Sequence, residues 1–179
     1  MSEPPGPQDE LLVAIEGECA LVRVQGRGYF KNAASLKRFG VAAIGSGCRR
    51  VVLDMDECRS MDSTFMGVLA GLALRLRKET DGRLVAMNLS PKTASLLDTL
   101  GLTRLIETHE VDADPDGLKK CVRDMLDLSA LDATHPNQRL TLETMLEAHQ
   151  TLAETTTENR ARFKDVIAYL EQDLEQLKG

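Results

Sequence analysis

The chain has 179 residues, 42% of them hydrophobic, and a formal net charge of −6 at pH 7. This length suits one α/β domain with an appendage, and the core must be mainly aliphatic because only 3% of the residues are aromatic. The acidic balance argues against nucleic acid as a partner, because phosphate binding requires clustered positive charge. No apolar run approaches the length of a membrane span, so we expect no membrane partner.

The N-terminus and the cysteines favour a cytoplasmic protein. Residues 1–9 are rich in proline and lack the basic and apolar run of a secretory signal, so we expect a short disordered leader. The cysteines form no C-x-x-C pair, and most of them adjoin apolar runs, as buried reduced thiols do. Their even number also permits disulfides. They are Cys19, Cys48, Cys58 and Cys121.

The chain from residue 10 to residue 131 alternates strand and helix patterns. Two apolar runs, 11–15 and 19–24, are separated by an acidic, glycine-containing turn and predict a hairpin. A helical pattern then runs from Asn32 to Ile44. The β-branched run 51–55 predicts a strand that is buried on both faces.

The strongest predicted helix follows a predicted loop over residues 56–61. Its apolar residues recur at spacings of three and four, which predicts one buried stripe, and Asp81-Gly82 ends the helix. The stripe consists of Phe65, Leu69, Leu72 and Leu76.

Further elements complete the predicted order β-β-α-β-α-β-α-β-α. Run 84–87 predicts a strand, and Ser90-Pro91 begins a helix, since a hydroxyl can cap the free amides and proline needs no amide donor there. Gly101 closes that helix. We expect an edge strand after residues 102–106 and a last helix over 116–131. This alternation predicts an α/β fold in which helices pack on a mixed sheet.

Residues 137–178 differ in kind and predict a C-terminal helical extension. They are rich in Glu, Gln and Leu and have a heptad-like apolar stripe whose centre, from His149 onward, is polar. The threonine run 155–157 disfavours helix because β-branched side chains lose rotamer freedom, and it also offers a capping box. We favour one long or hinged helix that pairs with a second copy to form a homodimer. A helical hairpin folded on the same chain is the alternative.

The junction between the buried strand and the strongest helix carries the most specific motif. The strand Val51-Val52-Leu53-Asp54 leads to a loop that ends in Met61-Asp62-Ser63-Thr64, and the helix opens with Phe65-Met66-Gly67-Val68-Leu69. A second block, the Ser90-Pro91 helix, ends in Leu100-Gly101-Leu102. Together these residues resemble the STAS family (sulphate transporter and anti-sigma factor antagonist) over about residues 11–131.

The resemblance implies a regulatory binding module of a bacterial partner-switching pathway, which acts in signal transduction and transcription regulation. In antagonists of this family, an anti-sigma factor that is also a serine protein kinase phosphorylates the serine at the position of Ser63, with Thr64 as the alternative here. The unphosphorylated form binds the anti-sigma factor, and a serine phosphatase restores binding after phosphorylation. The expected partner-binding residues are Asp62, Ser63, Thr64, Phe65, Met66, Tyr29 and Phe30.

Elementary electrostatics favours a switch at Ser63. Asp62 and Ser63 stand where the helix begins, so their side chains can cap its free amides. Phosphorylation adds about −1.5 to −2 charges, which a helix N-terminus tolerates. The domain therefore stays folded while a partner that docks beside Asp62 is repelled. The simpler alternative is that Ser63 is only a helix cap.

Two other functions remain as alternatives. The first is an oligomeric STAS scaffold subunit of a signalling assembly, with residues 137–178 as its association segment. The second is a haloacid dehalogenase-like phosphatase, in which Asp54 would be the nucleophile and Asp56 the general acid, with Ser90 binding phosphate. Convincing acids for its magnesium site are lacking, so we expect no enzyme activity.

We expect neither a metal nor a cofactor. His109, His135 and His149 are far apart and lie on dissimilar segments, so a metal site would require chance convergence. The pair Gly26-x-Gly28 lacks the third glycine of a dinucleotide fingerprint and predicts a loop.

Overall fold

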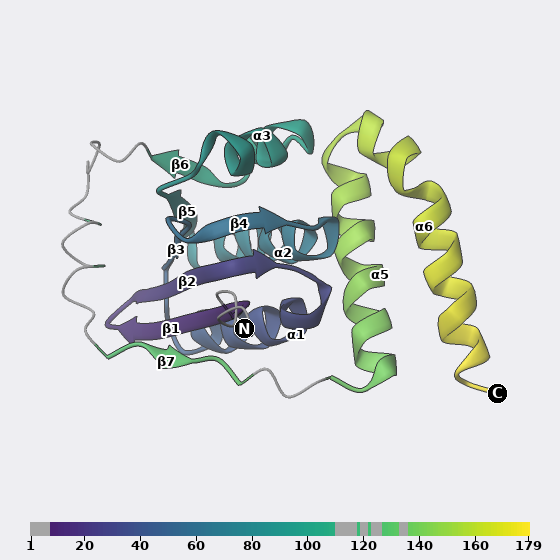
Figure 1. Ribbon diagram of the computed structural model, residues 1–179, viewed down its shortest axis with the longest axis horizontal. Coiled ribbons are helices and arrows are strands. Elements are labelled where there is room, and N and C mark those ends of the chain that lie inside the picture. Colours follow the sequence, from purple (N-terminus) through teal and green to yellow (C-terminus); the bar gives the residue numbers. More distant parts are fainter. Residues whose placement is uncertain (1–7, 110–117, 119–121, 123–126, 133–135) are drawn as a thin grey trace, which may run out of the picture.

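The computed structural model describes residues 8–109, 118, 122, 127–132 and 136–179. The strands of this part form one mixed sheet in the order β6-β5-β3-β2-β1-β7, with the short β4 paired to β2 (Figure 1). The pairs β1–β2 and β1–β7 are antiparallel, and all other pairs are parallel. The strands are β1 (Glu10–Glu16), β2 (Cys19–Gly28), β3 (Arg50–Asp54), β4 (Cys58–Met61), β5 (Arg83–Met87), β6 (Glu107–His109) and β7 (Ser129–Ala130). The predicted mixed sheet with packed helices is confirmed.

The helices divide into a group on the sheet and a C-terminal pair (Figure 1). Helices α1 and α2 lie together behind the sheet, α3 lies near β4, and α5 crosses the ends of α1 and α2 with α6 on its outer side. Their bounds are α1 (Phe30–Gly45), α2 (Ser63–Thr80), α3 (Pro91–Thr99), a 3-10 turn η1 (Leu102–Arg104), α5 (Gln138–Thr155) and α6 (Thr157–Gln176).

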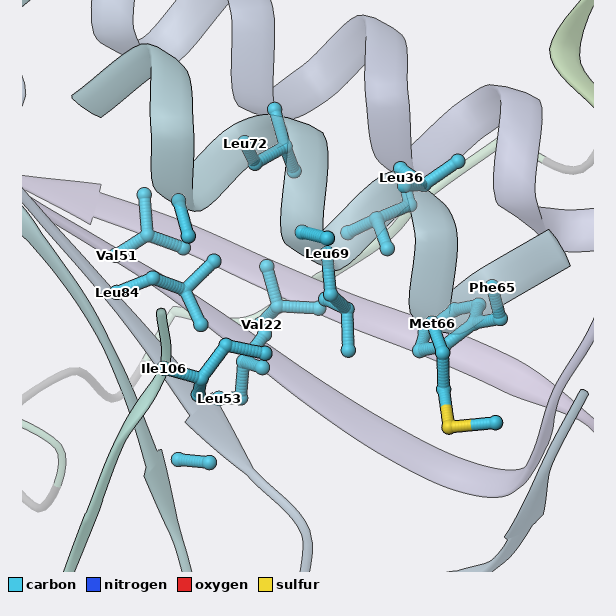
Figure 2. Close-up of a cluster of buried hydrophobic side chains, with 14 of the residues drawn as sticks. Val22, Leu36, Val51, Leu53, Phe65, Met66, Leu69, Leu72, Leu84 and Ile106 are labelled. Atoms are coloured by element: carbon cyan, nitrogen blue, oxygen red, sulfur yellow. The ribbon is translucent and has the colours of Figure 1, made fainter. Parts of the chain in front are cut away.

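The main core lies between the sheet and α2. Leu69 points from α2 toward aliphatic side chains of the strands, Phe65 lies against Gly28 at the end of β2, and Leu72 packs against Gly40 of α1 (Figure 2). Successive side chains of β2 point to opposite faces of the sheet. Val22 belongs to this core, and Leu21 belongs to a second cluster on the other face. This packing fixes α2, and therefore its first residue, against the sheet.

Two short strands were not predicted. Residues 58–61, expected as loop, form β4, which pairs with β2. Residues 129–130, expected within a helix that ends at Leu131, form β7 on the edge beside β1. Neither segment has an apolar run, and each becomes a strand only through pairing with a distant one. Most of that expected helix lies outside the described residues, although residues 118 and 122 are helical.

The C-terminal extension is a hairpin on the same chain, so the prediction of one long helix is wrong and the alternative, a helical hairpin, forms instead. Thr156 has extended backbone (φ −144°, ψ 158°), and its Oγ1 accepts a hydrogen bond from the Asn159 amide at 3.0 Å. The threonine run thus ends α5 and caps α6. Helix α5 packs on α2 and α1, and α6 packs on α5.

Candidate functional site

Asp62 joins the N-termini of the two helices behind the sheet. Its Oδ1 accepts a hydrogen bond from the Phe65 amide of α2 at 2.8 Å, and its Oδ2 accepts one from the Phe30 amide of α1 at 2.8 Å. Its own amide donates to the carbonyl oxygen of Gly28 at 3.0 Å. Because one carboxylate satisfies free amides of both helices, the predicted cap is Asp62, and the two helix starts form one corner of the molecule.

Ser63 is the first residue of α2 and is half-buried. Its Oγ lies 2.8 Å from Nε2 of His149 on α5, and Nδ1 of this histidine lies 2.7 Å from the carbonyl oxygen of Met145. A carbonyl only accepts, so Nδ1 carries a proton, and in the neutral imidazole Nε2 accepts from the Ser63 hydroxyl. The Ser63 hydroxyl is therefore covered by the C-terminal hairpin rather than capping α2.

His149 itself is held from two sides. It is only 3% exposed, and its ring packs edge-on against Phe163 of α6 with 5.2 Å between centroids. The sequence pattern indicated only a polar position in the stripe of a dimer helix. No local signal could have shown its contact with Ser63, because 86 residues separate the two in the chain.

The residues predicted to bind a partner fall into two groups. Phe30 is 38% exposed, and Tyr29 beside it is half-buried, with its ring edge-on to Phe30 at 5.6 Å. Thr64, Phe65 and Met66 are buried at 3%, 0% and 4% exposure. In this conformation these three side chains are inaccessible to a partner, so their predicted partner contact would require a change of structure.

Helix α5 approaches α2 very closely one turn beyond Ser63. A Cβ added to Gly67 would clash with the backbone carbonyl of Ala148, so glycine is the residue that fits there. On the outer side of this contact, Lys37 of α1 forms an ion pair with Glu147 of α5. The hairpin thus rests directly on the backbone of α2.

The turn between α5 and α6 is attached to the end of α3. The Asn159 side chain is fully buried, and its Nδ2 donates to the carbonyl oxygen of Leu100 at 2.9 Å. The hydroxyl oxygen of Thr155 lies 3.4 Å from the same oxygen, while its shorter bond, at 2.6 Å, goes to the Leu152 carbonyl oxygen of its own helix. These bonds satisfy a free carbonyl at a helix end and give the hairpin a second attachment point.

Asp54 is a structural residue rather than an available nucleophile. It is 6% exposed; its Oδ2 accepts from Nε of Arg23 at 2.9 Å and its Oδ1 from Nδ2 of Asn88 at 3.0 Å. Asp56 is exposed, and Ser90 caps α3 by accepting from the Thr93 amide at 3.1 Å. The phosphatase alternative is therefore not favoured by the geometry.

The remaining candidate ligands do not converge in the part of the chain that the structure describes, where no three or more His, Cys, Asp or Glu side chains are grouped to hold a metal. Cys19, Cys48 and Cys58 are buried, and burial raises the pKa of the Cys48 and Cys58 thiols. His109 lies beside Glu107 on β6, with 2.7 Å between Nε2 and Oε1. Cys121 and His135 lie outside the described residues.

Within the described ranges, none of the helices combines the length and the apolar character that crossing a membrane would require.

Comparison with known proteins identifies the fold. A family model described as "Mlab, STAS domain" matches residues 11–107. The unphosphorylated anti-sigma factor antagonist SpoIIAA superposes with a TM-score of 0.52 at 18% identity, over 65% of this chain and 99% of that one. A putative anti-sigma factor antagonist from Thermotoga maritima gives 0.51 at 15% identity, over 64% and 93%. An anti-sigma factor antagonist from Mycobacterium paratuberculosis gives 0.50 at 20% identity, over 71% and 100%.

Proposed function

Since this chain belongs to the STAS domain family, we propose that it is a binding module of the anti-sigma factor antagonist type, switched by phosphorylation of Ser63. The observation that carries the proposal is the position of Ser63 as the first residue of α2, next to the Asp62 carboxylate that joins two helix starts. The partner would be an anti-sigma factor that is also a serine protein kinase, and a serine phosphatase would reverse the modification.

The proposed docking surface comprises Tyr29, Phe30, Asp62 and Ser63. Phe30 supplies exposed apolar area, and the two helix starts supply a rigid frame. A phosphate on Ser63 would add about −1.5 to −2 charges beside Asp62. An acidic partner surface would be repelled by this charge. An apolar partner surface would bind more weakly, because burying the phosphate requires that it be desolvated. The N-terminus of α2 tolerates the same charge, so the STAS domain stays folded.

The Ser63 hydroxyl is a better phosphate acceptor than that of Thr64. Thr64 is buried, at 3% exposure. Ser63 is half-buried, and its hydroxyl is hydrogen-bonded to a single side chain, the imidazole of His149. The switch should therefore depend on residue 63.

Phosphopeptide mapping of the protein expressed in its source bacterium tests this proposal. We expect one phosphate on wild type, mapped to Ser63, and none on Ser63→Ala. Ser90→Ala is the matched control, because Ser90 also stands at a helix start but caps α3. Equal phosphate on Ser63→Ala and wild type, or a phosphate mapped to Thr64, would contradict the proposed switch.

A scaffold subunit that assembles through α6 is a second candidate, favoured by a different surface. The outer side of α6 exposes Val166, Tyr169 and Leu177, at 39%, 71% and 43% exposure, and their spacing places them along one stripe. Light scattering after size exclusion should give twice the chain mass for wild type and one chain mass for Tyr169→Glu. One chain mass for both would remove this candidate.

A further inference from the structure

The hairpin occupies the place that a phosphate on Ser63 would need. The Nε2 atom of His149 lies at hydrogen-bond distance from the Ser63 oxygen, on which the phosphate would be carried. In phosphoryl transfer the Ser63 oxygen bonds to the γ-phosphorus of the kinase's ATP, the bond from that phosphorus to ADP breaks, and the hydroxyl proton passes to a base. The tetrahedral phosphoryl group cannot share this space with the imidazole.

The imidazole cannot leave this position by itself. Its Nδ1 is bonded to a carbonyl of its own helix, its ring packs on Phe163, and it is nearly fully buried. One residue before it, Ala148 touches the backbone of α2 at Gly67. Freeing the Ser63 hydroxyl therefore requires separation of α5 from α2, and not only a side-chain rotation.

From this geometry we propose that the α5–α6 hairpin (residues 138–176) is an intramolecular inhibitor that covers the Ser63 corner and must be displaced before a kinase or binding partner can engage it. The proposal deepens the proposed function and rests on it for the identity of the kinase. The occupant of the α2 surface is this chain's own helix α5. Phosphorylation, once made, would hold the hairpin off by occupying the space of His149.

The attachments of the hairpin suit a displaceable element. They include the Ser63–His149 bond, an exposed Lys37–Glu147 ion pair and the bonds to the Leu100 carbonyl oxygen. Each has a hydrogen-bonding alternative in water, so separation exchanges these contacts for solvent. The apolar part of the contact includes Ala148, Leu152 and Phe163, which are buried in the main core and would be exposed on separation.

Hydrogen exchange of the full chain, without any kinase, tests the cover. Gly67→Ala places a Cβ against the Ala148 carbonyl, so we expect amides of α5 and α6 to exchange about tenfold faster while those of β2 and β3 stay unchanged. Gly71→Ala is the matched control, since Gly71 lies on the same helix and a Cβ there would have no neighbour within 4 Å. His149→Ala and Ser63→Asp should also speed exchange in the hairpin.

Exchange in the hairpin that matches wild type in both Gly67→Ala and His149→Ala would overturn the proposal. Slower exchange in Ser63→Asp would also overturn it, because a negative charge would then hold His149 in place. If Gly67→Ala does not fold, His149→Ala decides.

The kinase step is measured separately. Extracts of the source bacterium with ATP should label Ser63 several-fold faster in Gly67→Ala than in wild type and Gly71→Ala. Equal labelling rates in the three proteins would overturn the inhibitory role. Absence of label in every protein, with fast hairpin exchange in Gly67→Ala, would instead contradict the proposed function and leave the displaceable cover supported.

Discussion

The STAS domain and the C-terminal hairpin are held in place by different kinds of contact. In the domain, Val51, Leu53, Leu69 and Leu84 have no exposed surface and belong to one continuous apolar cluster. Polar residues make up much of the buried part of the hairpin, which consists of Thr144, Ala148, His149, Leu152, Asn159, Phe163 and Leu170. The domain is thus stabilised by burial of apolar area, and the hairpin by a few directed bonds with some apolar contact.

This difference bears on regulation. Apolar burial over a large area is lost only when the whole domain unfolds, whereas directed bonds at two points can open locally. The polar centre of the hairpin meets the domain at Ser63, which is the residue proposed to change its charge. A directed polar contact between the hairpin and the domain therefore coincides with the proposed switch.

The largest expected effect is a loss of domain stability in Phe65→Ala. The ring is fully buried and lies against Gly28, so its removal leaves a cavity and should lower the free energy of unfolding by about 3–5 kcal/mol. Denaturant unfolding followed by circular dichroism measures this change. Tyr169→Ala on the hairpin, where the side chain is 71% exposed, should lie within about 0.5 kcal/mol of wild type. Equal losses in both would contradict the contrast between the two regions.

A smaller effect is expected for Asp54→Ala, which leaves the buried end of Arg23 and the Asn88 amide without their acceptor. We expect a loss of about 2–3 kcal/mol, because Arg23 keeps partial access to water. Asp56→Ala, at an exposed position two residues after Asp54, is the control and should be near neutral. If magnesium-dependent hydrolysis of a phosphate ester by wild type disappeared in Asp54→Asn, the structural role would be refuted.

Asn159→Ala should destabilise the hairpin without affecting the sheet. It removes the 2.9 Å bond to the Leu100 carbonyl oxygen, whose nearest remaining donor, the Thr155 hydroxyl at 3.4 Å, is shared with Leu152; the expected cost is about 1–2 kcal/mol. Amide exchange should increase in α6 and in the last turn of α5, while β3 amides keep their protection. Arg160→Ala is a suitable control, since that side chain is exposed. A uniform increase across β3 and α6 would show that the hairpin opens only with the domain.

The smallest effect concerns acid. The Arg27 guanidinium bonded to Asp9 lowers the pKa of this carboxyl below its ordinary value of 3.8. The ionised form is favoured in the fold, so its contribution is complete above pH 3.8 and is lost as the pH falls through the lowered pKa. The thermal unfolding midpoint of wild type should therefore fall more than that of Asp9→Asn when the pH is lowered from 5 to 2. A parallel fall would contradict the stabilising role, which salt should also weaken.

Elements defined by their own residues were predictable. The apolar stripe of α2 follows from its spacing, and Asp62 and Ser90 do cap α2 and α3 as their side chains and positions indicate. The stripe already included Phe65, so its burial could have been anticipated, whereas placing it on the docking surface relied on the family motif instead. The position of Ser63 at the start of α2 required no tertiary information.

Elements that depend on a distant partner were not predictable. Strands β4 and β7 are too short and too polar to have a pattern of their own, and they form because β2 and β1 offer free backbone groups. The threonine run allowed both a hinged helix and a hairpin.

The packing of α5 on α2 could be seen only in the tertiary structure, because it depends on the fit between Gly67 and Ala148 and on the hydrogen bonds to the Leu100 carbonyl oxygen. The same contact set the environment of Ser63. Local side-chain chemistry determines where a helix begins, but what covers its first hydroxyl is decided by chain segments whose proximity only folding creates.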